Sequence, residues 1–328
     1  MRNRKKLLTP DFMDEAGLQL LRAREDVELV SYPVGLEPSD LHRLLHDATG
    51  IALAATRYGR PELEASPAIE VVARIGVGFD AVDVPALTGR GVPLMVAGTA
   101  NATSVAEHAV FMMMALAKRA LELDARMRQG LWHDRKSGLP VELSGATVLV
   151  VGFGRIGTRT APRCAAFGMH VLVYDPYVSA ELVTRAGYEK VDDLAAALGR
   201  ADYVTIHCPQ NAETAGMFDA ARLARMKRGA ILVNTARGGI VDETALLEAL
   251  RSGRVAGAGL DVLAQEPVGP GHPLLQLPNV ISSPHVAGVT VQAMAAMSRM
   301  TALNMLSVLD GTPIRENVIN KEVLGSRP

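Results

Sequence analysis

The feature that most constrains the fold of this chain is an apolar run, Val148–Val151, that leads directly into glycines spaced G-x-G-x-x-G. The glycines are Gly152, Gly154 and Gly157, and the residues after them have the pattern of a helix. On its own this spacing is weak evidence, but a preceding strand and a following helix are the context in which it binds a dinucleotide. The segment therefore predicts a strand–turn–helix unit of a parallel sheet, with a nucleotide at the turn.

Each position of this loop has a physical role in the prediction. Gly152 permits the tight turn, Gly154 lets the backbone approach a pyrophosphate, and Gly157 lets the helix pack closely on the strand. The helix N-terminus offers N–H donors and positive potential to the phosphates, with the first amides at Arg155 and Ile156. Further along the same helix, a proline at position 162 (Pro162) removes a backbone donor, and we expect a kink there.

An acidic residue, Asp175, closes the next predicted strand. Its carboxylate can accept hydrogen bonds from the ribose hydroxyls of a dinucleotide and would repel a 2′-phosphate. The following Pro176-Tyr-Val178 contains no arginine that would reverse this preference. The predicted cofactor is therefore NAD in preference to NADP. The alternative is that Asp175 is only a solvated turn residue at the end of a strand.

Short β-branched runs alternate with helical stretches along the chain, a pattern typical of α/β architecture with parallel sheets. A first series of predicted strands covers Lys6–Leu8, Val27–Val30, Ile51–Ala54, Glu70–Ala73 and Leu94–Val96. A second series covers Thr147–Val151, His170–Tyr174, Tyr203–Ile206, Ala230–Asn234, Ala256–Leu260 and Val280–Ser282, enough for a complete dinucleotide-binding sheet. Two helices, predicted over Ser104–Gln129 and Thr290–Leu309, would carry the chain into this second domain and back, and the tail from Ile314 would rejoin the first.

Composition and charge narrow the classes of function. The chain has 328 residues, of which 48% are hydrophobic and 21% charged, so we expect an ordered, soluble protein of two domains. A net charge of -1 gives no electrostatic reason to expect nucleic acid or an anionic membrane as a partner. The apolar run Val105–Ala117 is too short to span a bilayer. With no secretory signal and only Cys164 and Cys208, the chain is expected in the cytoplasm.

Three further segments follow strands of the second series, namely Asn234-Thr-Ala-Arg237-Gly-Gly, Asp261-Val-Leu-Ala-Gln-Glu266-Pro and Ser283-Pro-His285. Because parallel strands end at the same edge of a sheet, these segments can converge. For a hydride transfer at the C2 carbon of a 2-hydroxy acid, His285 would exchange the proton. Glu266 would hold the ring and stabilise its charged form, and Arg237 would bind the carboxylate. Taken singly, each residue also has a structural explanation: a satisfied histidine, a surface turn and a strand-end cap.

One pair of histidines is discounted as a metal site. His42 and His46 lie four residues apart on a predicted helix, but no third ligand stands at a suitable spacing. We therefore expect no metal.

In chain order, the motifs G-x-G-x-x-G, A-R-G-G, Q-E-P and S-P-H-x-A-G resemble the D-isomer-specific 2-hydroxyacid dehydrogenase family. The resemblance covers nearly the whole chain and is strongest to short phosphoglycerate-dehydrogenase-type members without a C-terminal regulatory domain. It implies a Rossmann NAD-binding domain over residues 101–290, inserted into a flavodoxin-like substrate domain over residues 1–100 and 291–328. Both would be doubly wound parallel sheets. It also implies NAD-dependent chemistry at C2 of a small 2-hydroxy or 2-keto acid, with Arg237, Glu266 and His285 as the catalytic residues.

The resemblance implies further contacts and a subunit interface. Cofactor contacts beyond the glycine loop and Asp175 would come from Thr103, Cys208, Thr235, Ala236 and Asp261. The substrate would meet the amides of Val77 and Gly78, with Arg74, Asn101 and Arg237 as further substrate-binding residues. Family members are generally homodimers through the NAD-binding domain, and Trp132 would suit that interface, although a place in the core is an alternative.

Two departures leave the substrate and the class of function open. Members that act on phosphoglycerate usually have Arg-Ser where Ala54-Ala55 stands, which puts 3-phosphoglycerate in doubt unless Arg57, Arg60 or Arg74 binds the phosphate. A true 3-phosphoglycerate dehydrogenase is therefore one alternative. The other, from a different class, is an NAD-gated binding protein like the corepressors that share this fold. Such a protein would need a peptide groove on the first domain, for which the sequence carries no signature.

Overall fold

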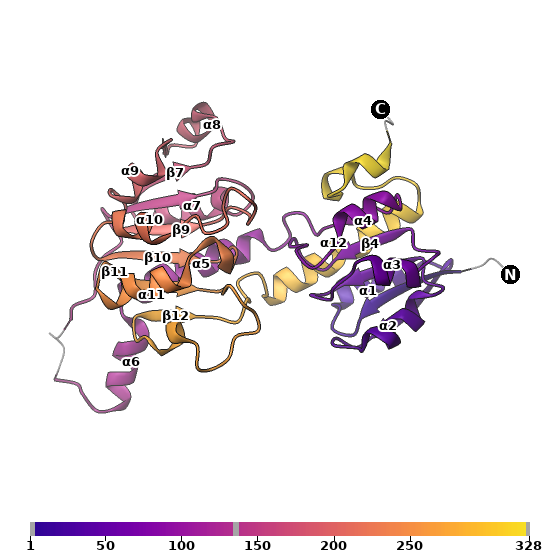
Figure 1. Cartoon of the computed structure of the whole chain (residues 1–328), viewed down its shortest axis with the longest axis horizontal. Coiled ribbons are helices and arrows are strands. Elements are labelled where there is room, and N and C mark those ends of the chain that lie inside the picture. Colours follow the sequence, from indigo (N-terminus) through magenta and orange to yellow (C-terminus); the bar gives the residue numbers. More distant parts are fainter. Residues whose placement is uncertain (1–3, 134–137, 326–328) are drawn as a thin grey trace. The chain divides into compact units, whose positions relative to one another are not determined.

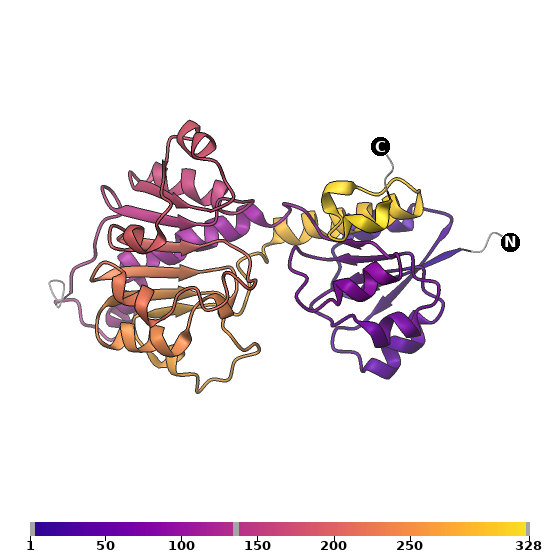
Figure 2. The same ribbon diagram turned by 45° about the horizontal axis from the view of Figure 1, so that its top comes forward.

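The computed structural model of the chain describes residues 4–133 and 138–325 (Figure 1). These residues belong to two compact units. We call Met1–Asn101 with Val289–Pro328 unit 1, and Ala102–Gly288 unit 2. Each unit is a parallel β-sheet with helices on its faces (Figure 2).

Unit 1 is built on a five-stranded parallel sheet in the order β2-β1-β3-β4-β5, which is the flavodoxin-like strand order. Its strands are β1 (Lys5–Pro10), β2 (Val27–Tyr32), β3 (Gly50–Leu53), β4 (Val71–Arg74) and β5 (Leu94–Met95). Its helices are α1 (Glu15–Arg22), α2 (Pro38–Leu45), α3 (Arg60–Ala65), α4 (Val84–Gly89) and α12 (Val291–Leu309).

Alternating side chains of these strands build a core on each face of the sheet. Leu7 packs with the residues of α1 and α12, and its neighbour Leu8 packs with those of α2 and α4. The chain beyond α12 returns to the sheet edge, where the Ile319 amide donates to the Leu94 carbonyl at 2.9 Å. Residues from both ends of the chain therefore complete unit 1.

Unit 2 holds a seven-stranded parallel sheet in the order β12-β11-β10-β9-β6-β7-β8. Counted from β6, this is the Rossmann order with one strand added at the β12 edge. Its strands are β6 (Thr147–Val151), β7 (His170–Tyr174), β8 (Glu189–Lys190), β9 (Tyr203–Ile206), β10 (Ala230–Asn234), β11 (Val255–Leu260) and β12 (Val280–Ser282). Its helices are α5 (Ala102–Ala117), α6 (Ala120–Arg128), α7 (Gly157–Ala166), α8 (Ala180–Arg185), α9 (Leu194–Leu198), α10 (Ala220–Arg225) and α11 (Glu243–Arg251).

The structure differs from the predicted elements of unit 2 in two places. The edge strand β8 was not expected, because Glu189–Lys190 is short and charged and has no apolar alternation. The single helix predicted over Ser104–Gln129 is wrong: α5 ends at Ala117 and α6 begins at Ala120, with Arg119 in the left-handed region at φ 51°. No glycine or proline marks this break in the sequence.

Two other features of the chain follow from the described residues. Pro162 lies at an exposed position inside α7, which is assigned as one helix from Gly157 to Ala166, and the kink expected there stays a prediction. Among the described helices, none combines the length and the apolar character that crossing a membrane requires.

Candidate functional site

The candidate site of unit 2 is formed where its parallel strands end. Neighbouring strands β10, β11 and β12 lead into Thr235–Arg237, Asp261 and Ser283–His285 respectively. On the other side of β9, strand β6 leads into the glycine loop and β7 leads into Asp175. The segments selected from the sequence therefore follow successive strands at one edge of a single sheet, the edge at which doubly wound folds bind ligands.

The three glycines of the loop have different surroundings. Gly152 has φ 93°, a backbone conformation that residues with a side chain rarely adopt. An added Cβ would also lie 2.7 Å from the Cys208 nitrogen, which leaves no room for a side chain. A Cβ on Gly157 would lie 2.0 Å from the Gly152 carbonyl oxygen. A Cβ on Gly154 would meet nothing within 4 Å. The loop is therefore packed tightly from within and open at Gly154, where a phosphate group would approach.

Asp175 is held with its carboxylate in a fixed orientation. One oxygen accepts from the Phe153 amide of the glycine loop at 2.8 Å, and the other accepts from the Tyr177 amide at 2.9 Å. The Tyr177 hydroxyl in turn donates to the Glu213 carboxylate, which raises the pKa of Tyr177. Two carboxylates therefore lie near this strand end. Their negative charges would repel the 2′-phosphate that distinguishes NADP from NAD.

The residues present fit a nicotinamide dinucleotide. The Thr235 hydroxyl is buried and has no hydrogen-bond partner among the described residues, a situation that a bound ligand would resolve. Burial raises the pKa of the Cys208 thiol to about 11, so the thiol stays neutral beside the glycine loop. No group of three potential metal ligands occurs within the described ranges.

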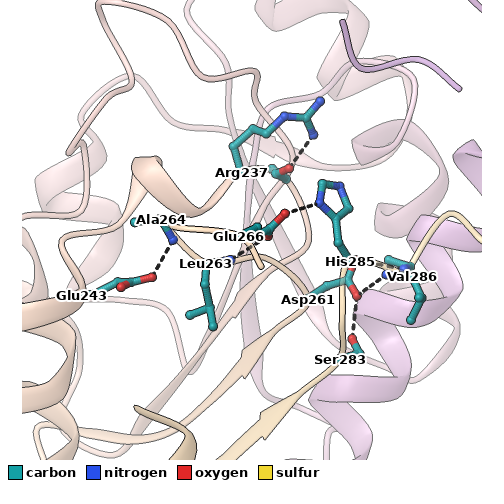
Figure 3. A network of polar contacts seen from close by, with 11 residues as sticks. Arg237, Glu243, Asp261, Leu263, Ala264, Glu266, Ser283, His285 and Val286 are labelled. Atoms are coloured by element: carbon teal, nitrogen blue, oxygen red, sulfur yellow. Dashed lines mark hydrogen bonds and ion pairs between the residues drawn. The ribbon is translucent and has the colours of Figure 1, made fainter. Parts of the chain in front are cut away.

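His285 and Glu266 form a direct pair (Figure 3). The His285 Nδ1 atom lies 2.7 Å from Glu266 Oε2, and the other carboxylate oxygen accepts from the Leu263 amide at 2.9 Å. Because an ionised carboxylate only accepts hydrogen bonds, the proton is on Nδ1, and the Nε2 atom is left to exchange a proton. The His285 side chain is 49% exposed.

Arg237 is positioned by the turn after β10. Its Nη1 atom donates to the Ala236 carbonyl at 2.7 Å, and its own carbonyl accepts from the Asn234 amide group at 2.9 Å. In Figure 3 the guanidinium extends toward the same side of the network as the imidazole of His285. The next residue, Gly238, has no room for a side chain, because a Cβ there would lie 1.9 Å from the Leu263 carbonyl carbon. The turn with Arg237 is therefore packed directly on the loop with Glu266.

Asp261 has a clear structural role, whatever its contact with a cofactor. Its side chain is buried, and it accepts from the Ser283 hydroxyl and from the amides of Val286 and Ala287 at 2.6–2.9 Å. These bonds fix the loop that bears His285. The cofactor contact inferred for Asp261 from the family resemblance stays a prediction.

The residues inferred for substrate binding lie in unit 1, apart from Arg237. The loop after β4 is braced by Arg74, whose Nε atom donates to the Gly78 carbonyl at 2.9 Å, next to Val77. Asn101 ends this part of unit 1, and Thr103 is an exposed residue of the first turn of α5 in unit 2. The roles of these five residues toward substrate and cofactor stay predictions.

Two polar residues around the site, His108 and Glu243, were not selected from the sequence, and Ser283 was selected only as part of its segment, with no role of its own. His108 and Ser283 connect to Asp261, and Glu243 accepts from the Ala264 amide at 2.7 Å in the loop that bears Glu266. In the sequence, His108 could have been noticed because it lies within the nearly apolar run Val105–Ala117. Nothing in the neighbouring sequence distinguishes Glu243 from other charged surface residues.

Comparison with known proteins gives the family. The family profile described as "D-isomer specific 2-hydroxyacid dehydrogenase, NAD binding domain" matches residues 110–287. The D-3-phosphoglycerate dehydrogenase of Archaeoglobus fulgidus is 36% identical over 316 residues, which cover 96% of this chain. That match spans only 59% of the relative's own length.

Two further relatives match over nearly their full length. The glyoxylate reductase of Thermofilum pendens is 36% identical over 334 residues, covering 99% of this chain and 97% of the relative. The solved structure of an NADPH-dependent glyoxylate/hydroxypyruvate reductase from Sinorhizobium meliloti, in complex with NADP and malonate, has 30% identity and a TM-score of 0.82, covering 96% of this chain and 98% of that one. The chain belongs to the D-isomer-specific 2-hydroxyacid dehydrogenase family.

Proposed function

We propose that this protein is an NAD-dependent D-2-hydroxyacid dehydrogenase, which transfers a hydride between nicotinamide and the C2 carbon of a small 2-hydroxy or 2-keto acid. The observation that carries the proposal is the His285–Glu266 pair at 2.7 Å, at the sheet edge that also bears the glycine loop and Asp175. Unit 2 is then the NAD-binding domain and unit 1 the substrate-binding domain.

In this reaction His285 moves a proton at Nε2. In reduction, the nitrogen donates that proton to the C2 oxygen as C2 gains the hydride, and the C2 carbonyl becomes an alcohol. In oxidation, it removes the hydroxyl proton. Glu266 keeps the ring in the required tautomer through Nδ1 and stabilises the positive charge that the ring carries before it donates. When bound, NADH would supply the hydride in reduction and NAD⁺ would accept it in oxidation.

Arg237 provides the cation that the substrate requires. Its guanidinium can bind a carboxylate through two parallel hydrogen bonds, which fixes the orientation of C2, and it stabilises negative charge that develops on the C2 oxygen. The buried Thr235 hydroxyl, Gly154 and Asp175 would hold NAD at the nicotinamide, pyrophosphate and ribose positions in turn.

For the substrate we propose an unphosphorylated short 2-keto acid, such as glyoxylate or hydroxypyruvate. Ala54 and Ala55 have no polar or charged side chain that could bind a phosphate, and Arg74 donates to a loop carbonyl. Arg57 and Arg60 are exposed, and the substrate panel below tests whether either of them binds one. The full-length similarity to a glyoxylate reductase supports the same substrate class.

The test is NADH oxidation with a panel of 2-keto acids that includes glyoxylate, hydroxypyruvate, pyruvate and 3-phosphohydroxypyruvate. We expect turnover, with the highest kcat/KM for an unphosphorylated acid. His285→Ala should lower kcat by about 10²–10⁴. Absence of turnover with every acid would instead favour a binding protein, and a preference for the phosphorylated acid would show that another cation binds the phosphate.

The proposal includes a homodimer through unit 2 and a location in the cytoplasm. Helix α6 has nine residues and none of them is buried, whereas a helix of this length is marginal in water unless something packs on it. Leu121, Met127 and Trp132 are 61%, 52% and 54% exposed, so a second copy could cover them. Sedimentation equilibrium should give a dimer, and L121D/M127D should shift it to monomer.

The location in the cytoplasm is supported by the cysteines. Cys164 and Cys208 are unpaired, in keeping with a reducing compartment.

A further inference from the structure

We propose that His108 and Ser283 are positioning residues for His285, and that they act through the buried carboxylate of Asp261. The inference rests on the proposed function, because it concerns the placement of the histidine that exchanges the proton. His108 lies on α5 and Ser283 follows β12, while Asp261 follows β11. The three side chains form one chain of hydrogen bonds within unit 2.

Asp261 is the centre of this arrangement. Its Oδ1 atom accepts from the Ser283 hydroxyl at 2.6 Å and from the Val286 amide at 2.8 Å, and Oδ2 accepts from the Ala287 amide at 2.9 Å. Its main-chain carbonyl accepts from the His285 amide at 2.8 Å. One residue therefore holds three consecutive amides of the loop, including that of His285 itself.

The direction of the hydrogen bonds specifies the state of His108. A carboxylate only accepts, so Ser283 uses its one hydroxyl proton for Asp261. The His108 Nε2 atom lies 2.8 Å from the Ser283 oxygen and must therefore be the donor. His108 consequently carries a proton on Nε2, and this donor supports the serine that orients Asp261.

The packing of α5 explains why His108 reaches this point. A Cβ on Gly257 would lie 3.0 Å from a methyl carbon of Leu116, and a Cβ on Gly259 would lie 2.8 Å from the Cβ of Met112. The glycines of β11 thus let α5 approach its face closely. Positions two apart on a strand share a face, and positions four apart on a helix share a stripe. The same register places His108 opposite Asp261, and their Nε2 and Oδ1 atoms are 3.9 Å apart.

The backbone of His285 makes this support necessary. Its φ is 54°, in the left-handed region that a residue with a Cβ adopts only at a cost in free energy. Such a conformation persists when surrounding contacts over-determine it. The bonds from Asp261 to residues 285–287 are such contacts, and we infer that loss of the His108–Ser283 link lets the loop, and with it the imidazole, leave its position.

The experiment compares His108→Leu with His108→Gln, whose Nε2 amide can still donate to Ser283. For reduction of the preferred keto acid, His108→Leu should lower kcat by about 10- to 100-fold, the cost of a misplaced catalytic group. KM and the NADH dissociation constant should change less than about threefold, and His108→Gln should recover most of kcat. Glu107→Gln, on the same helix and exposed, is the matched control.

A double-mutant cycle with Ser283→Ala separates a shared role from general destabilisation. Because either change breaks the same chain, the double variant H108L/S283A should be no slower than the slower single variant. Multiplicative effects, a normal kcat for His108→Leu, or a His108→Gln enzyme as slow as His108→Leu would each overturn the proposal.

A readout independent of turnover keeps this inference distinct from the proposed function. The imidazole signals in an NMR spectrum of the full chain should show His108 protonated on Nε2, and the His285 ring signals should move in His108→Leu but not in Glu107→Gln. If the wild-type protein reduced no keto acid, the proposed function would fail while this measurement would still decide the role of His108. Unmoved His285 signals in His108→Leu would refute it.

Discussion

At the scale of single residues, the chemistry of unit 2 depends on how two carboxylates are used. Asp261 is buried, and its carboxylate oxygens accept hydrogen bonds from the loop that bears His285. Glu266 lies nearer the surface and pairs with the His285 imidazole. Asp261 therefore acts on the loop and Glu266 acts on the ring. The Glu266–His285 contact could be predicted from the sequence, because the two residue types are complementary and follow neighbouring strands.

The role of Glu266 leads to a prediction about kcat. Keto-acid reduction needs a proton on Nε2 of a ring that Glu266 holds through Nδ1 at 2.7 Å, in the orientation from which the proton is donated. Glu266→Gln keeps the size of the side chain and a hydrogen-bonding group but removes the charge and loosens the hold on the ring. The value of kcat for keto-acid reduction should then fall by about 10- to 100-fold in steady-state kinetics.

The control for this variant is Glu248→Gln, an exposed carboxylate of α11 whose loss should leave kcat unchanged. NADH affinity should be nearly unchanged in both variants. A normal kcat in Glu266→Gln would show that the two residues do not act together.

A second prediction at this scale concerns the choice of cofactor. Asp175 is held by two amides in the orientation that a ribose would meet. Asp175→Ala removes a charged acceptor worth about 1.5 kcal/mol or more, so NADH should bind about 10-fold more weakly. NADPH should lose less, and the preference ratio measured from the two kcat/KM values should narrow. A wild-type enzyme that already prefers NADPH would contradict this interpretation of Asp175.

At the scale of elements, sequence patterns located most strands because the buried strands of a parallel sheet are continuous apolar runs. The sequence patterns failed where contacts with the rest of the fold determine the local structure. The break at Arg119 occurs without glycine or proline, and the edge strand β8 is polar. The approach of α5 to β11 was also beyond prediction, because it depends on which helix face meets Gly257 and Gly259. The residue brought in by that approach, His108, was missed for the same reason.

The packing of one turn on another gives an element-scale prediction. A Cβ at Gly238 would overlap the backbone of Leu263, so Gly238→Ala must displace the loop that bears Glu266 or the turn that bears Arg237. We expect kcat to fall by about 10-fold or more, with NADH affinity affected much less. Gly269→Ala is the matched control, since a Cβ there meets nothing within 4 Å and should leave steady-state kinetics unchanged. Normal kcat in Gly238→Ala would show that the two turns can separate without cost.

At the scale of the whole molecule, two sheets of different strand order, five-stranded and seven-stranded, each carry part of the predicted function. The division into two α/β domains was predictable, because strand and helix patterns repeat in two series. The sheet of unit 2 also contains a residue whose titration affects folding. His207, at the end of β9, is buried, and its Nδ1 atom has no partner among the described residues.

Burial lowers the pKa of His207 to about 3, which predicts how stability depends on pH. In the unfolded chain the same ring takes up a proton below about pH 6.5, whereas the folded protein keeps it neutral. The burial of neutral His207 therefore costs no stability at neutral pH. As the pH falls from about 6.5 toward about 3, the free energy of unfolding decreases, because only the unfolded chain takes up the proton. Between about pH 7 and pH 5, this one residue should lower the free energy of unfolding by about 2 kcal/mol.

His207→Gln preserves a polar group beside Thr205, the 3.0 Å partner of the ring, but does not titrate. Urea unfolding of the full chain gives the free energy of unfolding at about pH 7 and at about pH 5. The decrease between the two should be smaller for this variant than for the wild type. His170→Gln, at an exposed position on β7, serves as the control and should follow the wild-type curve. Equal acid sensitivity in His207→Gln and wild type would mean that the folded protein accommodates a charged His207, and that the sheet edge beside the glycine loop admits water.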